Sequence, residues 1–518
     1  MNRIESAAPL LPEILALHGK WRANKDAVIC GEERWTWGEF CAANHCFAHG
    51  LIEHGIQVGD RVGIVMSNGL PMVQALYGTM AAGACSVPIN LSVNDEALAG
   101  MLADAGVVAV VATRDQVSRI DGILEALPQT LTLLLTDDGL EEGWTSIDAL
   151  CAGQPCALPA INIVDDSPLN IIYSSGTTGL PKGILHTHRG RRDWAYDLAI
   201  ALRYNGSART LLTIGLYSNI SWVSMLCTLL AGGTLVVHTS FNADAFLQTT
   251  EAERITHTSM VPIQYQRVIE LLRTKGGDVS SMQAMMSCGS PLHEMLKQEI
   301  FALFPCGIIE LYGLTEGIIT TLEPEEAQGR WASVGKPLIG TDICIVNSQD
   351  EVVPANQSGE VVSRGRISMP CYWGREEATR DVRFIDGNDM EWLRSGDIGY
   401  LDEQGFLYIV DRKKDMILSG GQNIYPQDIE AVLFEHPAVD DVAVIGLPSQ
   451  RWGETPVALV VPTGAEMNPV AILEWANKRL GRQQRLAQVI LRDELPRNPN
   501  GKILKRELRV EYSGKNYD

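Results

Sequence analysis

Residues 173–183, Tyr-Ser-Ser-Gly-Thr-Thr-Gly-Leu-Pro-Lys-Gly, constrain the fold of this chain more than any other segment. The preceding residues 169–172, Leu-Asn-Ile-Ile, are mostly apolar and predict a strand that leads into a loop. Glycines let a loop approach an anion closely and turn its N–H groups inward, while hydroxyls add donors and a lysine adds charge. The segment therefore predicts a strand followed by a phosphate-binding loop with Ser174, Ser175, Gly176, Thr177, Thr178, Gly179 and Lys182.

The order of residues in this loop excludes one common type of nucleotide site. A standard P-loop reads Gly-x4-Gly-Lys followed by Ser or Thr, whereas here Lys182 lies between Pro181 and Gly183. An ordinary turn is the other interpretation of a few glycine and hydroxyl residues between periodic segments. The length of the segment and the lysine at its end favour a phosphate-binding loop of a different type.

Length and composition limit the class of protein. A chain of 518 residues exceeds the size at which one hydrophobic core stops growing, so we expect two or more domains. The apolar fraction is 46%, and no apolar run reaches the roughly 18 to 20 residues of a membrane-spanning helix, so we expect no transmembrane segment. An acid and a proline stand near the N-terminus where a secretory signal has a basic start and an apolar core, which predicts a cytoplasmic protein.

The charge distribution also bears on possible partners. A net charge of −21 disfavours attraction to nucleic acid, whose phosphates would be repelled. Residues 478–515 nevertheless contain eleven Lys and Arg against four Asp and Glu, which indicates either a solvated helix face or a surface that meets phosphates. His186 and His188 are two residues apart without a third ligand, so we expect structural roles for them rather than metal binding.

Hydrophobic periodicity predicts an α/β fold. Between residues 35 and 111, amphipathic runs alternate with short apolar strands such as 61–66 and 107–111, which is typical of a parallel sheet covered by helices. The alternation recurs around 210–213 and 234–237 and again before Tyr312. From about 335 to 411 short alternating runs dominate, and these predict a β-rich subdomain.

Five consecutive charged residues at 411–415 predict an exposed connection between domains. We therefore expect an N-terminal domain of residues 1–411 and a C-terminal α+β domain of residues 412–518. The second domain has its own signals, a helix at 426–434, a strand at 442–445 and a helix at 469–480.

Several motifs follow the phosphate loop, and together they resemble those of the adenylate-forming superfamily. This superfamily includes acyl-CoA synthetases, luciferases and stand-alone adenylation domains. The matching segments occur in the expected order and cover nearly the whole chain: 173–183, 288–292, 310–316, 392–397, 419–426 and 499–506. The resemblance implies a large N-terminal domain of layered sheets, a small mobile C-terminal domain, and activation of a carboxylate by ATP as an acyl-AMP.

The resemblance also implies roles in binding ATP. Gly289, Ser290 and Pro291 match a turn beside adenine, and Tyr312, with Gly313, would stack on the base. Thr315 would hydrogen-bond the α-phosphate and Glu316 would hold Mg²⁺, for which a carboxylate is a suitable hard ligand. Asp397 would accept hydrogen bonds from the ribose hydroxyls, and Arg412 matches the arginine that contacts ribose from the inter-domain segment. We expect the motif of Asp397 to form a loop just before a strand.

Further matches imply roles in catalysis and in the domain movement. Lys502 matches the catalytic lysine, and with Lys182 and Mg²⁺ it would offset the repulsion between carboxylate and α-phosphate. The C-terminal domain would swing about Lys414. Gly420 and Gly421 match a glycine hairpin that lets the pantetheine arm of CoA pass close to the backbone.

The acid and CoA sites depart most from the family pattern. Tyr217 and Ser218 lie where many relatives have Phe-His, and with Trp222 we expect them to line the acid pocket. Residues 482–487 lie where many have Gly-Tyr-Lys-Val-Pro-Lys, and Ser92 lies where some CoA ligases have an arginine. We therefore expect Arg482 and Arg485 to contact the CoA phosphates. Trp452, in the motif 450–454, points to CoA as the acceptor.

These observations predict an ATP- and Mg²⁺-dependent ligase that joins a carboxylic acid, either medium-chain or aryl, to CoA. A stand-alone adenylation enzyme that loads a carrier-protein thiol is an alternative. A non-catalytic nucleotide-binding protein is a weaker alternative, because Lys502, Glu316 and Asp397 are all present. The sequence does not identify the acid, and it leaves a homo-oligomer open.

Overall fold

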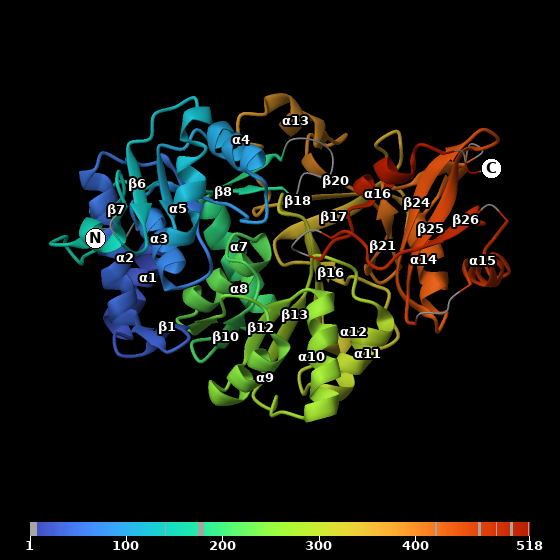
Figure 1. Ribbon diagram of the computed structural model, residues 1–518, viewed down its shortest axis with the longest axis horizontal. Helices are drawn as coiled ribbons and strands as arrows, with labels where there is room; N and C mark the ends of the chain where they lie inside the picture. The colour runs from blue at the N-terminus through green and yellow to red at the C-terminus, as the bar shows by residue number, and fades with distance from the viewer. Residues whose placement is uncertain are drawn as a thin grey trace.

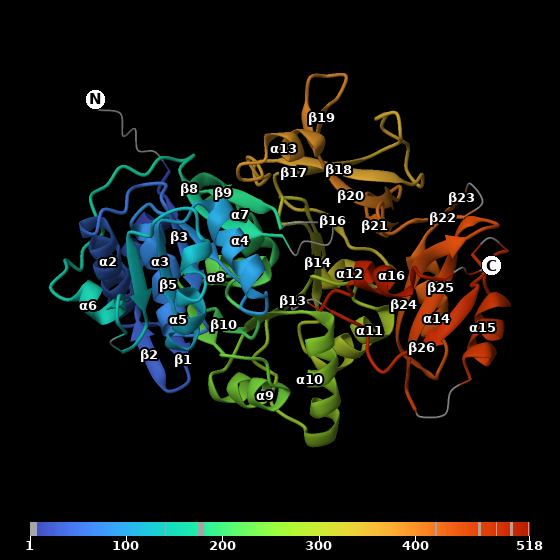
Figure 2. The ribbon, with the colours of Figure 1, turned by 45° about the horizontal axis from the view of Figure 1, so that its top comes forward.

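The computed structural model describes residues 8–139, 141–174, 181–419, 422–464, 468–482, 484–497, 501–515 and 517. These residues form four β-sheets (Figures 1 and 2). The sheet built from residues 61–187 lies toward one end of the long axis, and the sheet built from the last hundred residues lies at the other. In the described part of the chain, no helix is long and apolar enough to span a membrane.

The first sheet has seven strands in the order β7-β6-β5-β3-β4-β8-β9. Its pairs are parallel except β8 with β9. This arrangement confirms the parallel sheet expected from the alternation of helical and extended runs. The strands are β3 (Arg61–Val65), β4 (Cys85–Pro88), β5 (Ala109–Ala112), β6 (Leu133–Thr136), β7 (Thr145–Ser146), β8 (Pro168–Tyr173) and β9 (Gly183–Thr187).

The second sheet has nine strands in the order β16-β15-β14-β13-β12-β10-β11-β1-β2 and is parallel from β14 to β1. Its strands are β1 (Asp26–Cys30), β2 (Glu33–Thr36), β10 (Arg209–Leu212), β11 (Thr234–Val237), β12 (His257–Met260), β13 (Ala284–Ser287), β14 (Ile309–Gly313), β15 (Ile319–Leu322) and β16 (Lys336–Pro337).

Helices cover both sheets, and the largest hydrophobic cluster contains side chains from both, so the two sheets share one core. The helices of this part are α1 (Leu11–Trp21), α2 (Trp37–Glu53), α3 (Leu70–Ala81), α4 (Asp95–Ala105), α5 (Arg114–Asp121), α6 (Ile147–Cys151), α7 (His188–Ala201), α8 (Asn219–Leu230), α9 (Ala243–Ala252), α10 (Pro262–Lys275), α11 (Glu294–Leu303) and α12 (Pro324–Ala327).

Two smaller sheets follow. The third is antiparallel and confirms the β-rich segment: β17 (Thr341–Val346), β18 (Gly359–Gly365), β19 (Arg383–Ile385), β20 (Glu391–Leu401) and β21 (Leu407–Arg412), with α13 (Glu376–Asp381). The fourth combines β22 (Ile417–Ser419), β23 (Gln422–Ile424), β24 (Val439–Ser449), β25 (Gly453–Pro462) and β26 (Gln488–Leu491) with α14 (Pro426–Phe434), α15 (Pro469–Asn477) and α16 (Lys505–Tyr512).

One local prediction is wrong, and another fails at one residue, because Lys413 is exposed as expected but Asp411 is buried. Asp397 lies inside β20 rather than in a loop before a strand, because β20 pairs with β18 on one side and β21 on the other. Asp411 is 1% exposed although it begins the charged run expected to be an exposed connection. Its carboxylate accepts hydrogen bonds from the backbone N–H groups of Arg412 at 2.6 Å and Gln427 at 3.2 Å, and this pairing compensates for its burial.

Candidate active site

Tyr312, Asp397 and Arg412 meet where the second and third sheets adjoin. Tyr312 lies near the end of β14, and Asp397 in β20 is the register partner of Arg412 in β21. The Tyr312 hydroxyl donates a hydrogen bond of 2.7 Å to Oδ2 of Asp397, and Nε of Arg412 lies 3.1 Å from Oδ1. Asp397 is 2% exposed. A buried carboxylate held between a phenol and a guanidinium is a preorganised hydrogen-bond acceptor.

Burial raises the pKa of the Tyr312 hydroxyl well above its ordinary value, and the negative charge of Asp397 adds to this effect. The phenol therefore stays protonated near neutral pH and remains a donor to the carboxylate. The N–H of Asp397 donates to Oγ of Ser395 at 2.9 Å, which supports the backbone around the carboxylate from the same strand.

Lys502 lies beside this group, although it belongs to the C-terminal part of the chain. Burial lowers the pKa of its ammonium to about 7. The positive charge of Arg412 lowers the pKa further, whereas the negative charge of Asp397 opposes the shift. Gly501 precedes it with a φ of +77°, and a Cβ built there would lie 3.8 Å from the side chains of Val261 and Ile263. The C-terminal segment therefore reaches the start of α10.

Glu316 and Lys182 both contact Tyr372, an aromatic residue that the sequence analysis did not identify. The hydroxyl of Tyr372 donates a hydrogen bond of 2.8 Å to Oε1 of Glu316. Nζ of Lys182 lies 4.7 Å from the centroid of the same ring, within cation–π range. Tyr372 thus joins the lysine of the phosphate loop to the carboxylate expected to bind Mg²⁺. In the sequence, the signal for it is the aromatic pair Tyr-Trp at 372–373.

Thr315 and Glu316 occupy a tight turn between β14 and β15. Gly317 has a φ of +115°, and a Cβ built there would lie 2.5 Å from the carbonyl oxygen of Ile367. Only glycine fits such a close approach. The backbone N–H of Met369 donates to the carbonyl of Glu316 at 2.7 Å, so this turn is anchored to the segment that leads into Tyr372.

The two loops expected around the phosphates and the adenine are partly described. Ser175, Gly176, Thr177, Thr178 and Gly179 lie outside the described residues. Ser174 accepts a hydrogen bond at its Oγ from the backbone N–H of Lys182 at 3.2 Å, which closes the base of the phosphate loop.

The turn expected beside adenine follows β13. Gly289 has a φ of +89°, and Pro291 is exposed. Oγ of Ser290 is buried without a hydrogen-bond partner among the described residues, so a polar ligand at this turn would satisfy it.

The residues expected to line the acid pocket lie between β10 and α8. Ser218 caps α8, its Oγ accepting a hydrogen bond from the N–H of Ile220 at 3.3 Å. A Cβ at Gly215 would lie 2.1 Å from the Tyr217 ring, so glycine allows this ring to fold over the loop. Trp222 is 1% exposed and lies one turn into the helix.

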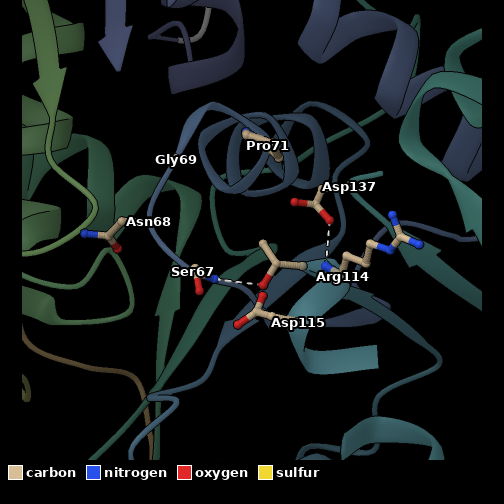
Figure 3. Close-up of a pocket in the computed structure, with 8 residues that line it drawn as sticks. Ser67, Asn68, Gly69, Pro71, Arg114, Asp115 and Asp137 are labelled. Carbon is tan, nitrogen blue, oxygen red and sulfur yellow. Dashed lines mark hydrogen bonds between the residues drawn. The ribbon is translucent and has the colours of Figure 1, made fainter. Parts of the chain in front are cut away.

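Asn68 holds the same loop from the first sheet. Its Nδ2 donates to the carbonyl oxygens of Ile214 and His238, both at 3.1 Å, and its Oδ1 accepts from the N–H of Leu216 at 2.8 Å. Asn68 also lines a pocket of about 540 Å³ beyond the carboxyl ends of β3, β5 and β6 (Figure 3). In that pocket Asp137 accepts a hydrogen bond from the N–H of Arg114 at 2.7 Å. The pocket contains none of the predicted site residues.

The residues expected to contact CoA are not gathered into one described cluster. Gly420 and Gly421 lie outside the described residues. Trp452 is 46% exposed, and the guanidinium of Arg451 lies 4.7 Å from the centroid of its ring. Arg482 and Arg485 are exposed, and neither forms an ion pair with a described residue.

The segment that holds Lys414 makes several contacts with the C-terminal part. Burial lowers the pKa of Lys414, and the charge of Arg412 adds to this shift. Nη1 of Arg509 in α16 lies 3.0 Å from a carboxylate oxygen of Asp415. His293, before α11, packs its ring against Phe434 of α14 with centroids 4.3 Å apart. The contact between His293 and Phe434 therefore joins the part of the chain that forms the fourth sheet to the part that forms the second.

The family model of the AMP-binding enzymes matches residues 18–373, and that of the AMP-binding enzyme C-terminal domain matches residues 428–502. The chain belongs to the AMP-binding enzyme family. The first match includes Lys182, Tyr312 and Glu316 and the second ends at Lys502, whereas Asp397, Arg412 and Lys414 lie between the two matches.

Individual members of the AMP-binding enzyme family are similar over almost the whole chain. Long-chain-fatty-acid–CoA ligase FadD13 of Mycobacterium tuberculosis is 35% identical over 485 residues, which cover 93% of each chain. Feruloyl-CoA synthase of an Amycolatopsis species is 32% identical over 504 residues, 94% of this chain and 96% of the relative. The crystal structure of ATP-bound MatB from Rhodopseudomonas palustris has a TM-score of 0.87 at 26% identity and covers 97% and 99% of the two chains.

This AMP-binding enzyme therefore belongs with the acid–CoA ligases, a group of enzymes that use ATP and CoA. The expected fold class is confirmed, with layered sheets in the large N-terminal part and a small α+β part at the C-terminus. The boundary near residue 411 and the roles of individual residues remain predictions.

Proposed function

We propose that this enzyme activates a medium-chain or aryl carboxylic acid as an acyl-AMP and then transfers the acyl group to CoA. The proposal rests chiefly on the convergence of Lys502, Asp397, Arg412 and Tyr312. In this arrangement the buried carboxylate of Asp397 would accept hydrogen bonds from the ribose hydroxyls, and the ammonium of Lys502 beside it would reach the reacting phosphate. These groups come from distant parts of the chain, which supports a nucleotide site over a local structural network.

In the first half-reaction, a carboxylate oxygen of the acid attacks the α-phosphorus of ATP. The bond to the bridging oxygen breaks, and pyrophosphate leaves with the electron pair. Both reactants are anionic, so preorganised positive charge lowers the barrier. Lys182, steadied over the Tyr372 ring, and Lys502 would supply that charge. Thr315, in the turn fixed by Gly317, would donate its hydroxyl to the α-phosphate.

The residues present fit a bound Mg²⁺. One carboxylate oxygen of Glu316 accepts a hydrogen bond from the Tyr372 hydroxyl, and this bond orients the carboxylate. Its second oxygen can then serve as a metal ligand. When bound, Mg²⁺ would neutralise charge on the polyphosphate. The Tyr372 hydroxyl would hold the carboxylate in place, a positioning role that leaves its own proton undisturbed because burial raises its pKa.

In the second half-reaction, the thiol of CoA attacks the carbonyl carbon of the acyl-AMP, and AMP leaves. Lys502 would occupy the face from which the thiol must approach. We infer that the C-terminal part turns about Lys414, withdrawing Lys502 and bringing Gly420 and Gly421 into the site. The exposed Arg482, Arg485 and Trp452 would then meet the CoA phosphates and pantetheine.

The proposed substrate class rests on the aromatic character of the acid pocket. Tyr217 and Trp222 present rings beside Ser218, and aromatic surfaces suit a flat or alkyl acid. One relative is named for an aryl product, feruloyl-CoA, and another for long-chain fatty acids. Transfer to a carrier-protein thiol is the second candidate, because the CoA contacts depart from the family pattern.

A screen of carboxylic acids for acid-dependent ATP–pyrophosphate exchange tests the first half-reaction. We expect exchange with at least one aryl or medium-chain acid and, when CoA is added, a thioester with the mass of acyl-CoA. Exchange without any thioester would favour the carrier protein, and no exchange with any acid would contradict the proposal.

A further inference from the structure

A buried arginine without a carboxylate partner lies behind the proposed acid pocket. Arg191, in the first turn of α7, is 1% exposed. Its Nε donates to Oδ1 of Asn170 in β8 at 3.0 Å, and Nη2 donates to Oδ1 of Asn219 in α8 at 2.8 Å. Among the residues that the structure describes, it forms no ion pair, whereas the next residue, Arg192, contacts both Asp165 and Asp193.

Uncompensated burial of a guanidinium is unfavourable, so it calls for a physical explanation. Two indole rings explain part of this stability. The guanidinium carbon of Arg191 lies 4.6 Å from the ring centroid of Trp194 and 5.3 Å from that of Trp222. Cation–π contacts and two neutral amide oxygens stabilise the cation but leave its charge unneutralised. Burial accordingly lowers the pKa of Arg191, to about 9.

The polar groups around Arg191 lack partners, and they are mostly donors. Nδ2 of Asn170, Nε1 of Trp222, Nε2 of His186 and both ring nitrogens of His188 are buried without a hydrogen bond in the described part of the chain. The amide and indole nitrogens can only donate, and each neutral histidine has one donor. Buried donors without partners beside an unpaired cation are complementary to an anion with several acceptor oxygens, above all a carboxylate.

This cluster adjoins the proposed site on two sides. Asn219 directly follows Ser218, and Trp222 is one turn further along α8, which packs beside α7 (Figures 1 and 2). His186 lies in β9, four residues after Lys182 of the phosphate loop. Burial lowers the pKa of His186, and the positive charge of Arg191 adds to this shift, so the strand that follows the phosphate loop passes close to the guanidinium.

We propose that Arg191 binds a second carboxylate at the far end of the substrate, so that the enzyme prefers dicarboxylic acids. The inference rests on the proposed function and narrows its substrate class. The first carboxylate would react near Lys182, while the second would pair with the Arg191 guanidinium and accept hydrogen bonds from Asn170 and Trp222.

The test compares kcat/KM in ATP–pyrophosphate exchange for α,ω-dicarboxylic acids and for monocarboxylic acids of equal carbon number, with terephthalate and 4-methylbenzoate as the aryl pair. We expect the parent enzyme to favour the diacid at one or more lengths. R191M should lower the diacid-to-monoacid ratio about 10- to 150-fold, the range for hydrogen bonds to a charged group. R192M is the matched control, since it removes a buried guanidinium that already has carboxylate partners, and it should leave the ratio unchanged.

R191K keeps the charge but loses the fork of donors, so it should retain a reduced preference for the diacid. If R191M does not fold, the ratio of diacid to monoacid kcat/KM in the parent enzyme and in R191K tests the inference. A parent that favours the monoacid at every length would overturn the inference, as would an equal loss for both acids in R191M. Exchange with monoacids alone would leave the proposed function standing, whereas no exchange with any acid would overturn both.

Discussion

The hydroxyl of Tyr312 donates a hydrogen bond of 2.7 Å to Oδ2 of Asp397, linking the end of β14 to β20. One residue is expected to stack on adenine and the other to bind ribose. Their direct contact means that the two halves of the expected nucleoside site would be positioned by each other. Because Asp397 is 2% exposed, its orientation depends on this bond and on Arg412 rather than on water.

Replacing Asp397 with asparagine should weaken the use of ATP more than the use of the acid. Asparagine keeps the shape but loses the charge that accepts from ribose, and such hydrogen bonds contribute about 1.5 to 3 kcal/mol. We expect the KM for ATP in pyrophosphate exchange to rise roughly 10- to 150-fold. Y312F keeps the Asp397 carboxylate and removes only the hydroxyl that donates to it, so the KM for ATP should rise less than in D397N. An unchanged KM for ATP in D397N would remove this residue from the site.

Lys502→Ala should abolish adenylation while sparing thioester formation from supplied acyl-AMP. The ammonium is needed only while pyrophosphate departs, and loss of one preorganised electrostatic donor typically costs about 10²- to 10³-fold in rate. Lys413→Ala is the matched control, because Nζ of Lys413 pairs with Glu360 at 3.0 Å and its side chain is largely exposed. Equal loss of both half-reactions in K502A would contradict a domain swing.

The pKa of Lys502, lowered to about 7 chiefly by burial, predicts a pH dependence. The ammonium is charged below this pKa and neutral above it, so kcat/KM for exchange should fall as the pH rises above about 7. Bound polyphosphate favours the cation, so the corresponding fall in kcat should occur at higher pH. In K502R the guanidinium stays charged, and this fall should disappear. The same profile in K502R would assign the titration to another group.

Gly421→Leu should block the second half-reaction and leave pyrophosphate exchange near that of the parent. A branched side chain would fill the space through which the pantetheine arm is expected to pass. Thioester formation from supplied acyl-AMP, followed by mass spectrometry, measures the effect. Turnover of CoA at the parental rate would make Gly421 a turn residue only.

Arg482→Ala and Arg485→Ala should each raise the KM for CoA several-fold without altering exchange. Both side chains are exposed, so the effect should shrink as added salt screens the charges. Arg479→Ala is a control in the same basic stretch. Its guanidinium lies 3.9 Å from the centroid of the Trp475 ring, so it already has a partner within the chain, and its loss should leave the KM for CoA unchanged. If the double variant uses CoA as well as the parent, the basic stretch is a solvated face.

Local structure was largely predictable from the sequence. The strand before the phosphate loop became β8, and the helix at 426–434 was correct to the residue. Both depend on hydrophobic periodicity and on local signals such as Pro426 at the helix start, which act over a few residues. The motifs likewise identified Tyr312, Asp397 and Lys502 as candidates, because residue type and order reflect the chemistry of a site.

What the tertiary structure decided was proximity. Pairing on both sides placed Asp397 within a strand, where its sequence motif indicated a loop. Docking of the fourth sheet brought Lys502 to Arg412 and lowered its pKa, and helix packing enclosed Arg191 without an acidic partner. Periodicity reports which face of an element is apolar, but it carries no information about which distant element covers that face. The sequence alone therefore determined the elements and the chemistry available, whereas long-range packing decided which charges meet in a buried environment.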